Sequence, residues 1–168
     1  MYSFDIPGDW SMKIRVLHLG KTVSPLLKQL IDEYLLRLKP MAGIEWKELP
    51  EPKNASKFPV EIRKKKEAEV FLKHIFPGDT LILLDEKGKL MSSMDFAGFL
   101  QKKMLHSAGN MVFVTGGAYG FDRSMYERAS MLLSLSPMTF SHQLVRLIFA
   151  EQLYRAFSII HNKPYHNE

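Results

Sequence analysis

The sequence predicts an α/β fold in which helices cover both faces of a mostly parallel sheet. Segments with the apolar pattern of strands alternate with segments of helical spacing along the chain. Two strand segments, residues 80–84 and 111–115, are continuous apolar runs, which is typical of strands buried on both faces of a parallel sheet. The chain has 168 residues and is 46% hydrophobic, enough for one domain with its own core.

The first elements follow from spacing and capping residues. Residues 12–19 alternate apolar and polar side chains, which predicts a strand. Ser24 and Pro25 supply an N-cap and a proline at the first helical position, and apolar residues then recur at helical spacing as far as residue 38. Residues 44–49 alternate again and end at two prolines, so we expect a second strand there.

The middle of the chain continues the alternation. Residues 57–76 predict a very polar helix, and the buried strand 80–84 follows it. Residues 85–88, Asp-Glu-Lys-Gly, have the composition of a turn. Ser92 and Asp95 then resemble a capping box, which predicts that a helix follows.

The last third begins with the strand 111–115, which leads directly into the glycine-rich loop 116–120. Asp122 is a candidate cap for a short helix, and residues 131–135 predict a short strand. The final helix should span residues 141–160. Twelve of these twenty residues are apolar, more than one stripe needs, so we expect other elements to cover this helix on two sides.

Composition limits the possible classes of function. There is no cysteine, which excludes disulfides, thiolate metal sites and cysteine nucleophiles. The first eleven residues have neither a basic start nor an apolar run, so they predict no signal or transit peptide, and we expect a cytoplasmic protein with no membrane span. We interpret residues 1–11 as an N-terminal extension and residues 12–168 as a single domain.

The net charge of +5 points only weakly to a polyanionic partner. Six Lys and Arg residues against one Glu lie between residues 53 and 66, a pattern that fits either a solvated helix face or a phosphate-contacting patch. His142, Arg146 and Arg155 on the final helix are candidate phosphate ligands, with interface or capping roles as the alternative. The six histidines lack the spacing of metal ligands, so no metal site is expected.

Ligands of open parallel sheets bind beyond the carboxyl ends of the strands, here the loops after Leu84, Thr115 and Leu135. Three glycines between residues 116 and 120 let a ligand approach the backbone, although a tight turn explains them equally well. Residues 135–140 mix apolar side chains with hydroxyls, which suits a nucleoside or an ordinary connection. The terminal tail holds an aromatic residue beside a histidine, a pair that can stack on an unpaired base or simply fray.

Three segments, FVTGGAYGFD, LSLSPMTFSHQLVRLIFAEQLYRAFSI and the terminal YHNE, resemble the RlmH-type methyltransferases of the SPOUT class. The resemblance runs from Met12 to the end of the chain. It implies a C-terminal trefoil knot, S-adenosylmethionine as methyl donor and a homodimer. It also implies methylation of N3 of a pseudouridine in a stem-loop of 23S rRNA, on the assembled ribosome.

The resemblance also implies the site residues. Cofactor-binding positions would be Leu84, Gly116, Leu135, Ser136, Pro137, Met138, Thr139 and Phe140. Tyr165 and His166 would position the substrate or transfer a proton. For RNA binding the resemblance supports His142 and Arg155, and the clustering of positive charge adds Lys64, Lys65 and Lys66 as candidates. A non-catalytic RNA-binding or ribosome-associated module, and a small-molecule α/β enzyme, stay open as alternatives on the residues alone.

Overall fold

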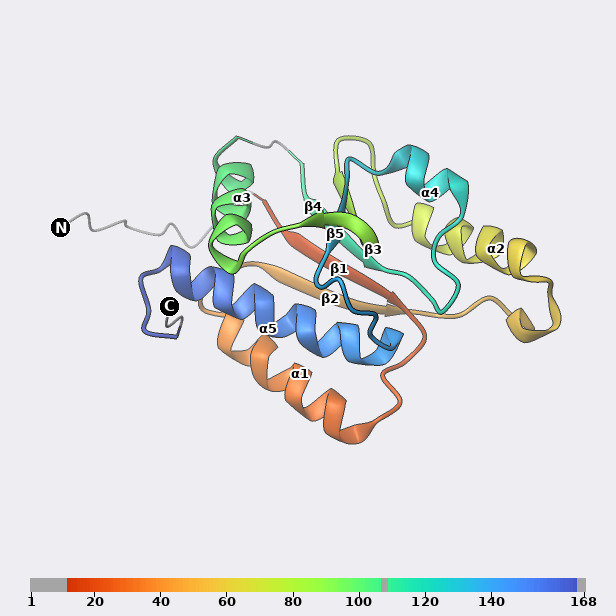
Figure 1. The fold of residues 1–168 in the computed structure, drawn as a ribbon, viewed down its shortest axis with the longest axis horizontal. Helices are drawn as coiled ribbons and strands as arrows, with labels where there is room; N and C mark the ends of the chain where they lie inside the picture. Colours follow the sequence, from red (N-terminus) through yellow and green to blue (C-terminus); the bar gives the residue numbers. More distant parts are fainter. Residues whose placement is uncertain (1–11, 107–108, 166–168) are drawn as a thin grey trace.

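A computed structural model, which describes residues 12–106 and 109–165, shows a five-stranded parallel sheet (Figure 1). The strand order is β2-β1-β4-β3-β5. The strands are β1 (Ile14–Leu19), β2 (Ile44–Leu49), β3 (Thr80–Leu90), β4 (Met111–Thr115) and β5 (Met131–Ser134). Helices alternate with them, as the sequence predicted: α1 (Pro25–Leu38), α2 (Val60–Leu72), α3 (Ser93–His106), α4 (Arg123–Arg128) and α5 (His142–Ile160), with a short 3-10 turn at Ala55–Lys57.

The two faces of the sheet carry separate hydrophobic clusters. In Figure 1, α1, α3 and α5 cover one face, and α2 and α4 cover the other. Phe113 of β4 packs on Phe149 of α5 with 4.9 Å between ring centroids, and both side chains are fully buried. Helix α5 packs against both α1 and α3, which confirms the expectation that it is covered on two sides. No helix in the described part of the chain is long and apolar enough to span a bilayer.

Side-chain caps fix the helix starts where the sequence predicted them. The hydroxyl of Ser24 accepts from Leu27 N at 3.4 Å, and that of Ser141 accepts from Leu144 N at 3.2 Å. The capping box before α3 is also formed. These caps satisfy backbone N–H groups that the first helical turn leaves without partners.

The predicted turn at residues 85–88 is wrong, because β3 continues through it to Leu90. The strand pairs with β5 on both sides of an irregularity, with Leu84 and then Lys89 opposite Leu133. Gly88 is needed for close approach rather than for a turn: a Cβ there would lie 2.6 Å from the backbone of β5. Sequence composition does not distinguish this role of glycine from a turn.

The polar helix predicted for residues 57–76 is shorter in the structure. Phe58 is extended because the next residue is Pro59, which disfavours helical geometry before it, and α2 therefore begins only at Val60. The helix ends at Leu72.

Candidate functional site

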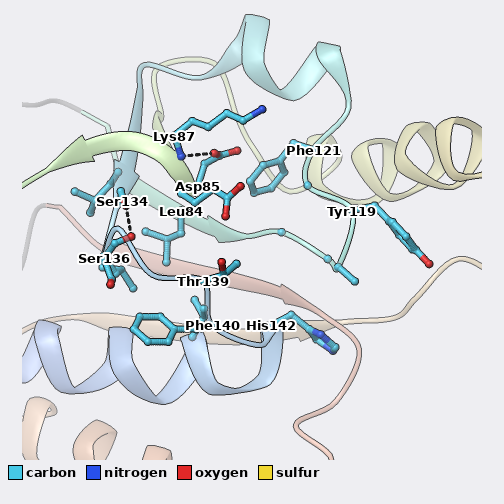
Figure 2. A pocket seen from close by; sticks show the side chains of 18 of the residues that line it. Leu84, Asp85, Lys87, Tyr119, Phe121, Ser134, Ser136, Thr139, Phe140 and His142 are labelled. Carbon is cyan, nitrogen blue, oxygen red and sulfur yellow. Dashed lines mark hydrogen bonds between the residues drawn. The ribbon is translucent and has the colours of Figure 1, made fainter.

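A cleft of about 580 Å³ lies at the carboxyl edge of the sheet, beyond β3, β4 and β5 (Figure 2). All five strands are parallel, so the loops after β4 and β5 meet at this edge. The third place selected from the sequence, after Leu84, lies within β3, and residues 84–87 of that strand line the cleft. Of the eight positions expected to bind a cofactor, seven line the cleft: Leu84, Gly116, Leu135, Ser136, Met138, Thr139 and Phe140. Pro137 is exposed and does not line it.

The glycine-rich loop forms one wall of the cleft. Its glycines are required by backbone conformation or by close neighbours. Gly120 has φ +75°, a region that other residues rarely adopt, and it forms an isolated bridge with Gly117. A Cβ on Gly116 would lie 3.1 Å from the ring of Phe121. A Cβ on Gly117 would lie 3.2 Å from Oε2 of Glu67, a buried carboxylate on α2. The loop therefore lies directly on α2.

The loop after β5 forms the opposite wall and is held by its own serines. The hydroxyl of Ser134 donates to Ser136 O at 2.9 Å, and the hydroxyl of Ser136 accepts from Met138 N at 2.9 Å. These bonds shape a tight connection that ends at the Ser141 cap of α5. Thr139 and Phe140 consequently lie in the cleft beside Leu84 (Figure 2).

The mouth of the cleft is charged. Lys64, Asp85, Glu86 and Lys87 all line it. The Tyr126 hydroxyl donates to Asp85 Oδ2 at 2.6 Å. Burial is the larger cause, and this hydrogen bond the second, of the rise in the pKa of Tyr126 to about 12. Tyr126 therefore stays protonated and orients the Asp85 carboxylate. Asp85 was not among the predicted site residues, because residues 85–88 were assigned to a turn, although Asp85 directly follows the predicted buried strand.

The arrangement suits a ligand with an apolar planar part and several polar groups. Leucine and phenylalanine side chains supply an apolar slot, while the two loops supply backbone donors and hydroxyls. Its volume falls in the range of about 300–1,000 Å³ that is typical of small-molecule sites. Within residues 12–106 and 109–165, no group of three or more His, Asp or Glu side chains is positioned to hold a metal ion.

The residues predicted to bind RNA lie in three places. His142, at the start of α5, and Lys64 line the cleft. Lys65 is exposed on α2, while the ammonium of Lys66 lies 4.9 Å from the ring centroid of Phe58. Arg155 does not line the cleft: it lies in the second half of α5, where it pairs with Glu151.

Tyr165 lies in an aromatic cluster with Arg155, beyond the end of α5. Its ring packs edge-on against Tyr154 at 4.6 Å, and the Arg155 guanidinium lies 5.1 Å from its centroid. Its hydroxyl lies 3.3 Å from both Tyr34 Oη and Glu151 Oε1. Burial, and then the contact with Tyr34, raises the pKa of Tyr165. His166 lies outside the described residues.

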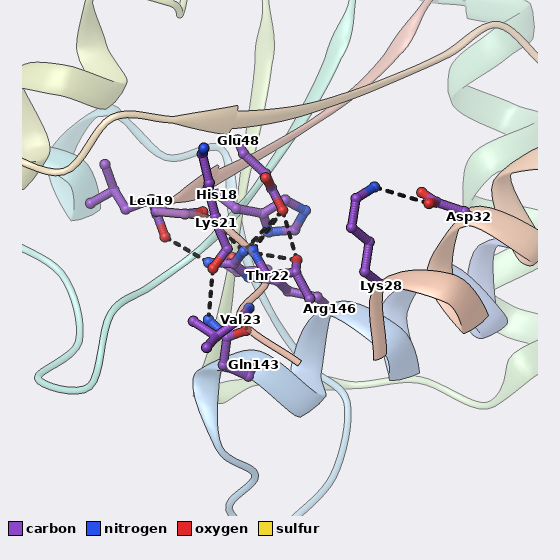
Figure 3. A network of polar contacts seen from close by, with 12 residues as sticks. His18, Leu19, Lys21, Thr22, Val23, Lys28, Asp32, Glu48, Gln143 and Arg146 are labelled. Carbon is purple, nitrogen blue, oxygen red and sulfur yellow. Dashed lines mark hydrogen bonds and ion pairs between the residues drawn. The ribbon is translucent and has the colours of Figure 1, made fainter. Parts of the chain in front are cut away.

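Arg146 of α5 is 2% exposed and binds the end of β1 (Figure 3). Its guanidinium donates to Leu19 O at 2.6 Å and to Gly20 O at 3.0 Å. It also donates to Thr22 Oγ1 at 3.1 Å and lies 3.5 Å from Glu48 Oε1. Nε of Arg146 has no hydrogen-bond partner in the described part of the chain. Burial and the bonds of its two terminal nitrogens to the chain after β1 favour the capping alternative over a phosphate ligand.

His18 lies in the same buried region, on β1. Its Nδ1 is 2.7 Å from the hydroxyl of Thr115, the residue before the glycine loop. Nε2 of His18 has no hydrogen-bond partner in the part of the chain that the structure describes. Burial, with a further contribution from the positive charge of Arg146, lowers the pKa of His18 to about 3. The ring is therefore neutral near neutral pH. No spacing in the sequence could have indicated this pairing between β1 and β4.

Comparison with known proteins gives consistent matches over the described fold. The model of a family described as "Predicted SPOUT methyltransferase" matches residues 12–166. A protein of Parabacteroides distasonis is 47% identical over 157 residues, which are 94% of this chain and all of that protein. Similar proteins of Porphyromonas gingivalis and Flavobacterium johnsoniae are 46% and 45% identical over the same lengths. All three are named "Ribosomal RNA large subunit methyltransferase H".

Among solved structures, a probable methyltransferase from Bordetella pertussis shares the fold. The TM-score is 0.50 at 13% sequence identity, and the match covers 88% of this chain and 95% of that one. This similarity shows the fold alone, because at 13% identity the individual residues of the two proteins cannot be matched.

Proposed function

Because the chain belongs to the SPOUT methyltransferase family, we propose that its cleft binds S-adenosylmethionine and that it methylates N3 of a pseudouridine in 23S rRNA. The chain is a methyltransferase of large-subunit ribosomal RNA, as its relatives are named at high identity over their whole length. The observation that carries the proposal is the convergence of seven of the eight expected cofactor positions on one cleft.

The residues of the cleft fit this cofactor. An adenine ring needs an apolar slot, which Leu84, Leu135 and Phe140 provide, and a ribose needs hydroxyl or backbone partners such as those of Ser136 and Thr139. The carboxylates of Asp85 and Glu86 at the mouth favour the positive charges of the donor's sulfonium and amino groups.

The bound cofactor supplies an electrophilic methyl group, so the protein mainly aligns the base and excludes water. N3 of the base carries a proton that must leave during transfer. We assign its removal to His166, or to a water that His166 orients, because the ordinary pKa of histidine suits this task. Tyr165 would orient the base. Lys64, Lys65, Lys66, His142 and Arg155 would contact the RNA backbone.

We further propose that the protein is a homodimer in which the tail of one subunit reaches the cleft of the other. Val23 N donates to Gln143 Oε1 at 3.0 Å, so the starts of α1 and α5 lie together, whereas Tyr34 and Tyr165 bring their later parts together. The two helices are therefore parallel neighbours, with the cleft near their starts and Tyr165 beyond their ends.

A two-fold axis perpendicular to this helix pair would place the helix ends of one subunit beside the helix starts of the other. The tail of each subunit would then approach the cleft of its partner. Exposed apolar side chains at the starts of the helices support such an interface: Val23, Leu26 and Leu30 are 80%, 73% and 44% exposed, and Leu144 is 37% exposed.

Three further features belong to the proposal. The family implies a trefoil knot in the C-terminal part of the chain. We propose residues 12–168 as one catalytic domain preceded by an extension at residues 1–11. An enzyme of this activity would act where ribosomes are, in the cytoplasm and on assembled particles.

Calorimetry with S-adenosylmethionine tests the cofactor assignment. We expect the wild type to bind and Gly116→Val to lose most of its affinity, because the added side chain would meet Phe121 and fill the cleft. Gly98→Val is the matched control, since a Cβ at this exposed position of α3 meets nothing within 4 Å. Absence of binding by the wild type would favour the alternative of a non-catalytic RNA-binding module.

Mass spectrometry of 23S rRNA tests the reaction itself. RNA from a strain that lacks the protein should lose one methyl group on a pseudouridine, and the purified protein with the methyl donor should restore it. Unchanged RNA in that strain would contradict the proposed substrate.

A further inference from the structure

Tyr119 is an exposed aromatic residue in the glycine-rich loop at the rim of the cleft. Its side chain lines the cleft, and the residue is 55% exposed, so it contributes little to the core. In Figure 2 its ring lies on the side of α2 and is directed away from Leu84, Thr139 and Phe140, where the cofactor is proposed to bind. This ring therefore lies between the cleft and the basic helix.

A partly buried ion pair on α2 supports this ring from one side. The Arg63 guanidinium lies 5.5 Å from the ring centroid of Tyr119, a cation–π distance. Nε of Arg63 donates to Glu67 Oε1 at 2.8 Å, and Glu67 is itself 8% exposed beneath Gly117. The hydrogen bond to Glu67 raises the pKa of Arg63, so the guanidinium stays charged. Loop and helix are thereby joined at this point.

The other aromatic residue at the mouth, Tyr126, is not available in the same way. Its hydroxyl is bound to Asp85, and its ring packs edge-on against Phe121 at 5.9 Å. Tyr119 combines exposure with a fixed cation on one side, and Lys64, the neighbour of Arg63 on α2, adds a positive charge that lines the cleft. A planar group can stack on the Tyr119 ring while a phosphate beside it lies near Lys64. An unpaired nucleotide has both a planar base and a phosphate.

We propose that Tyr119 is a stacking platform for an unpaired RNA base adjacent to the target nucleotide, with Arg63 fixing the ring from one side. This inference rests on the proposed function, because it concerns the RNA that would enter the same cleft. It assigns a positioning role for substrate to a residue of the glycine-rich loop and links that loop to the basic helix α2.

Steady-state methylation of ribosomal large subunits from a strain lacking the enzyme tests the platform. A base stacked on an aromatic side chain is worth about five- to 150-fold in affinity. We therefore expect Tyr119→Ala to raise KM for the subunits by about tenfold, with kcat within about twofold and the Kd for S-adenosylmethionine unchanged. Tyr119→Phe and Tyr119→Trp keep a ring and should retain KM near that of the wild type.

Three results would overturn the platform. These are a wild-type KM for Tyr119→Ala, a Kd for S-adenosylmethionine that rises in step with KM, and a Tyr119→Phe variant as impaired as Tyr119→Ala. The second result would assign the ring to the cofactor, and the third would assign the role to its hydroxyl.

Equilibrium binding of the labelled protein to the same subunits separates this inference from the proposed function. If the wild type binds but does not methylate, the proposed function fails, and weaker binding by Tyr119→Ala would still support the platform. If Tyr119→Ala binds as the wild type does, or if the wild type does not bind at all, the platform is rejected.

Discussion

His18 should make the protein less stable in mild acid. The residue is 0% exposed, and burial lowers its pKa from 6.5 to about 3, with Arg146 contributing further. The unfolded chain therefore takes up a proton near pH 6.5 that the folded chain does not accept until about pH 3. The unfolded state binds more protons between these values, so stability is fully present above about pH 6.5 and is lost as the pH falls toward 3.

The size of this effect follows from the shift. For one group with these two pKa values, the free energy of unfolding falls by about 2 kcal/mol between about pH 7.5 and about pH 5. His18→Asn removes the titration while an amide can still hydrogen-bond to the Thr115 hydroxyl. We expect the wild type to lose about 2 kcal/mol more than this variant over the same pH range.

Urea unfolding at the two pH values, at one fixed protein concentration, measures the difference. His106→Asn is the matched control, because it makes the same replacement at an exposed histidine, at the end of α3. If the wild type and His18→Asn lost stability in parallel, the neutral buried state of His18 would be refuted.

Three other substitutions test neighbouring parts of the site. Arg146→Met leaves the carbonyls of Leu19 and Gly20 without this donor and removes the positive charge beside Glu48, and urea unfolding should show a loss of about 3–5 kcal/mol. Gly120→Ala places a Cβ at φ +75° and should cost about 1–2 kcal/mol in the same assay, with weaker cofactor binding by calorimetry. The triple change of Lys64, Lys65 and Lys66 to Glu should raise KM for ribosomal subunits and flatten its salt dependence, and unchanged methylation kinetics would contradict an RNA-binding role. The double change of Lys65 and Lys66, which do not line the cleft, should act in the same direction while leaving cofactor affinity intact.

The sequence predicted most elements because their signals are local. The caps at Ser24, Asp122 and Ser141 act within three residues of themselves, and all three are formed. The buried strands β3 and β4 were recognisable from continuous apolar runs. The rule for the carboxyl edge of parallel sheets selected the loops after β4 and β5 and the segment after Leu84, which lines the cleft although it belongs to β3. Local patterns were therefore sufficient to locate the cleft.

The errors arose where a residue's role depends on a distant segment. Gly88 has the composition of a turn, but it serves the close approach of β3 to β5, which is more than forty residues away in the chain. Tyr119 was noted only as part of a glycine motif, since its support comes from Arg63 on another helix. Spacing within one segment contains no information about either contact.

The burial of Arg146 is explained by the strand ends at the carboxyl edge of the sheet, where the cleft lies. A cleft at the carboxyl edge of a parallel sheet requires strands to end there, and the carbonyls of Leu19 and Gly20 at the end of β1 then need donors. Arg146 supplies several donors from one side chain and has Glu48 nearby to offset its charge. Since Arg146 lies one turn after His142, satisfying these carbonyls also fixes the start of α5 against the sheet, and with it the wall that His142 and Val145 give to the cleft.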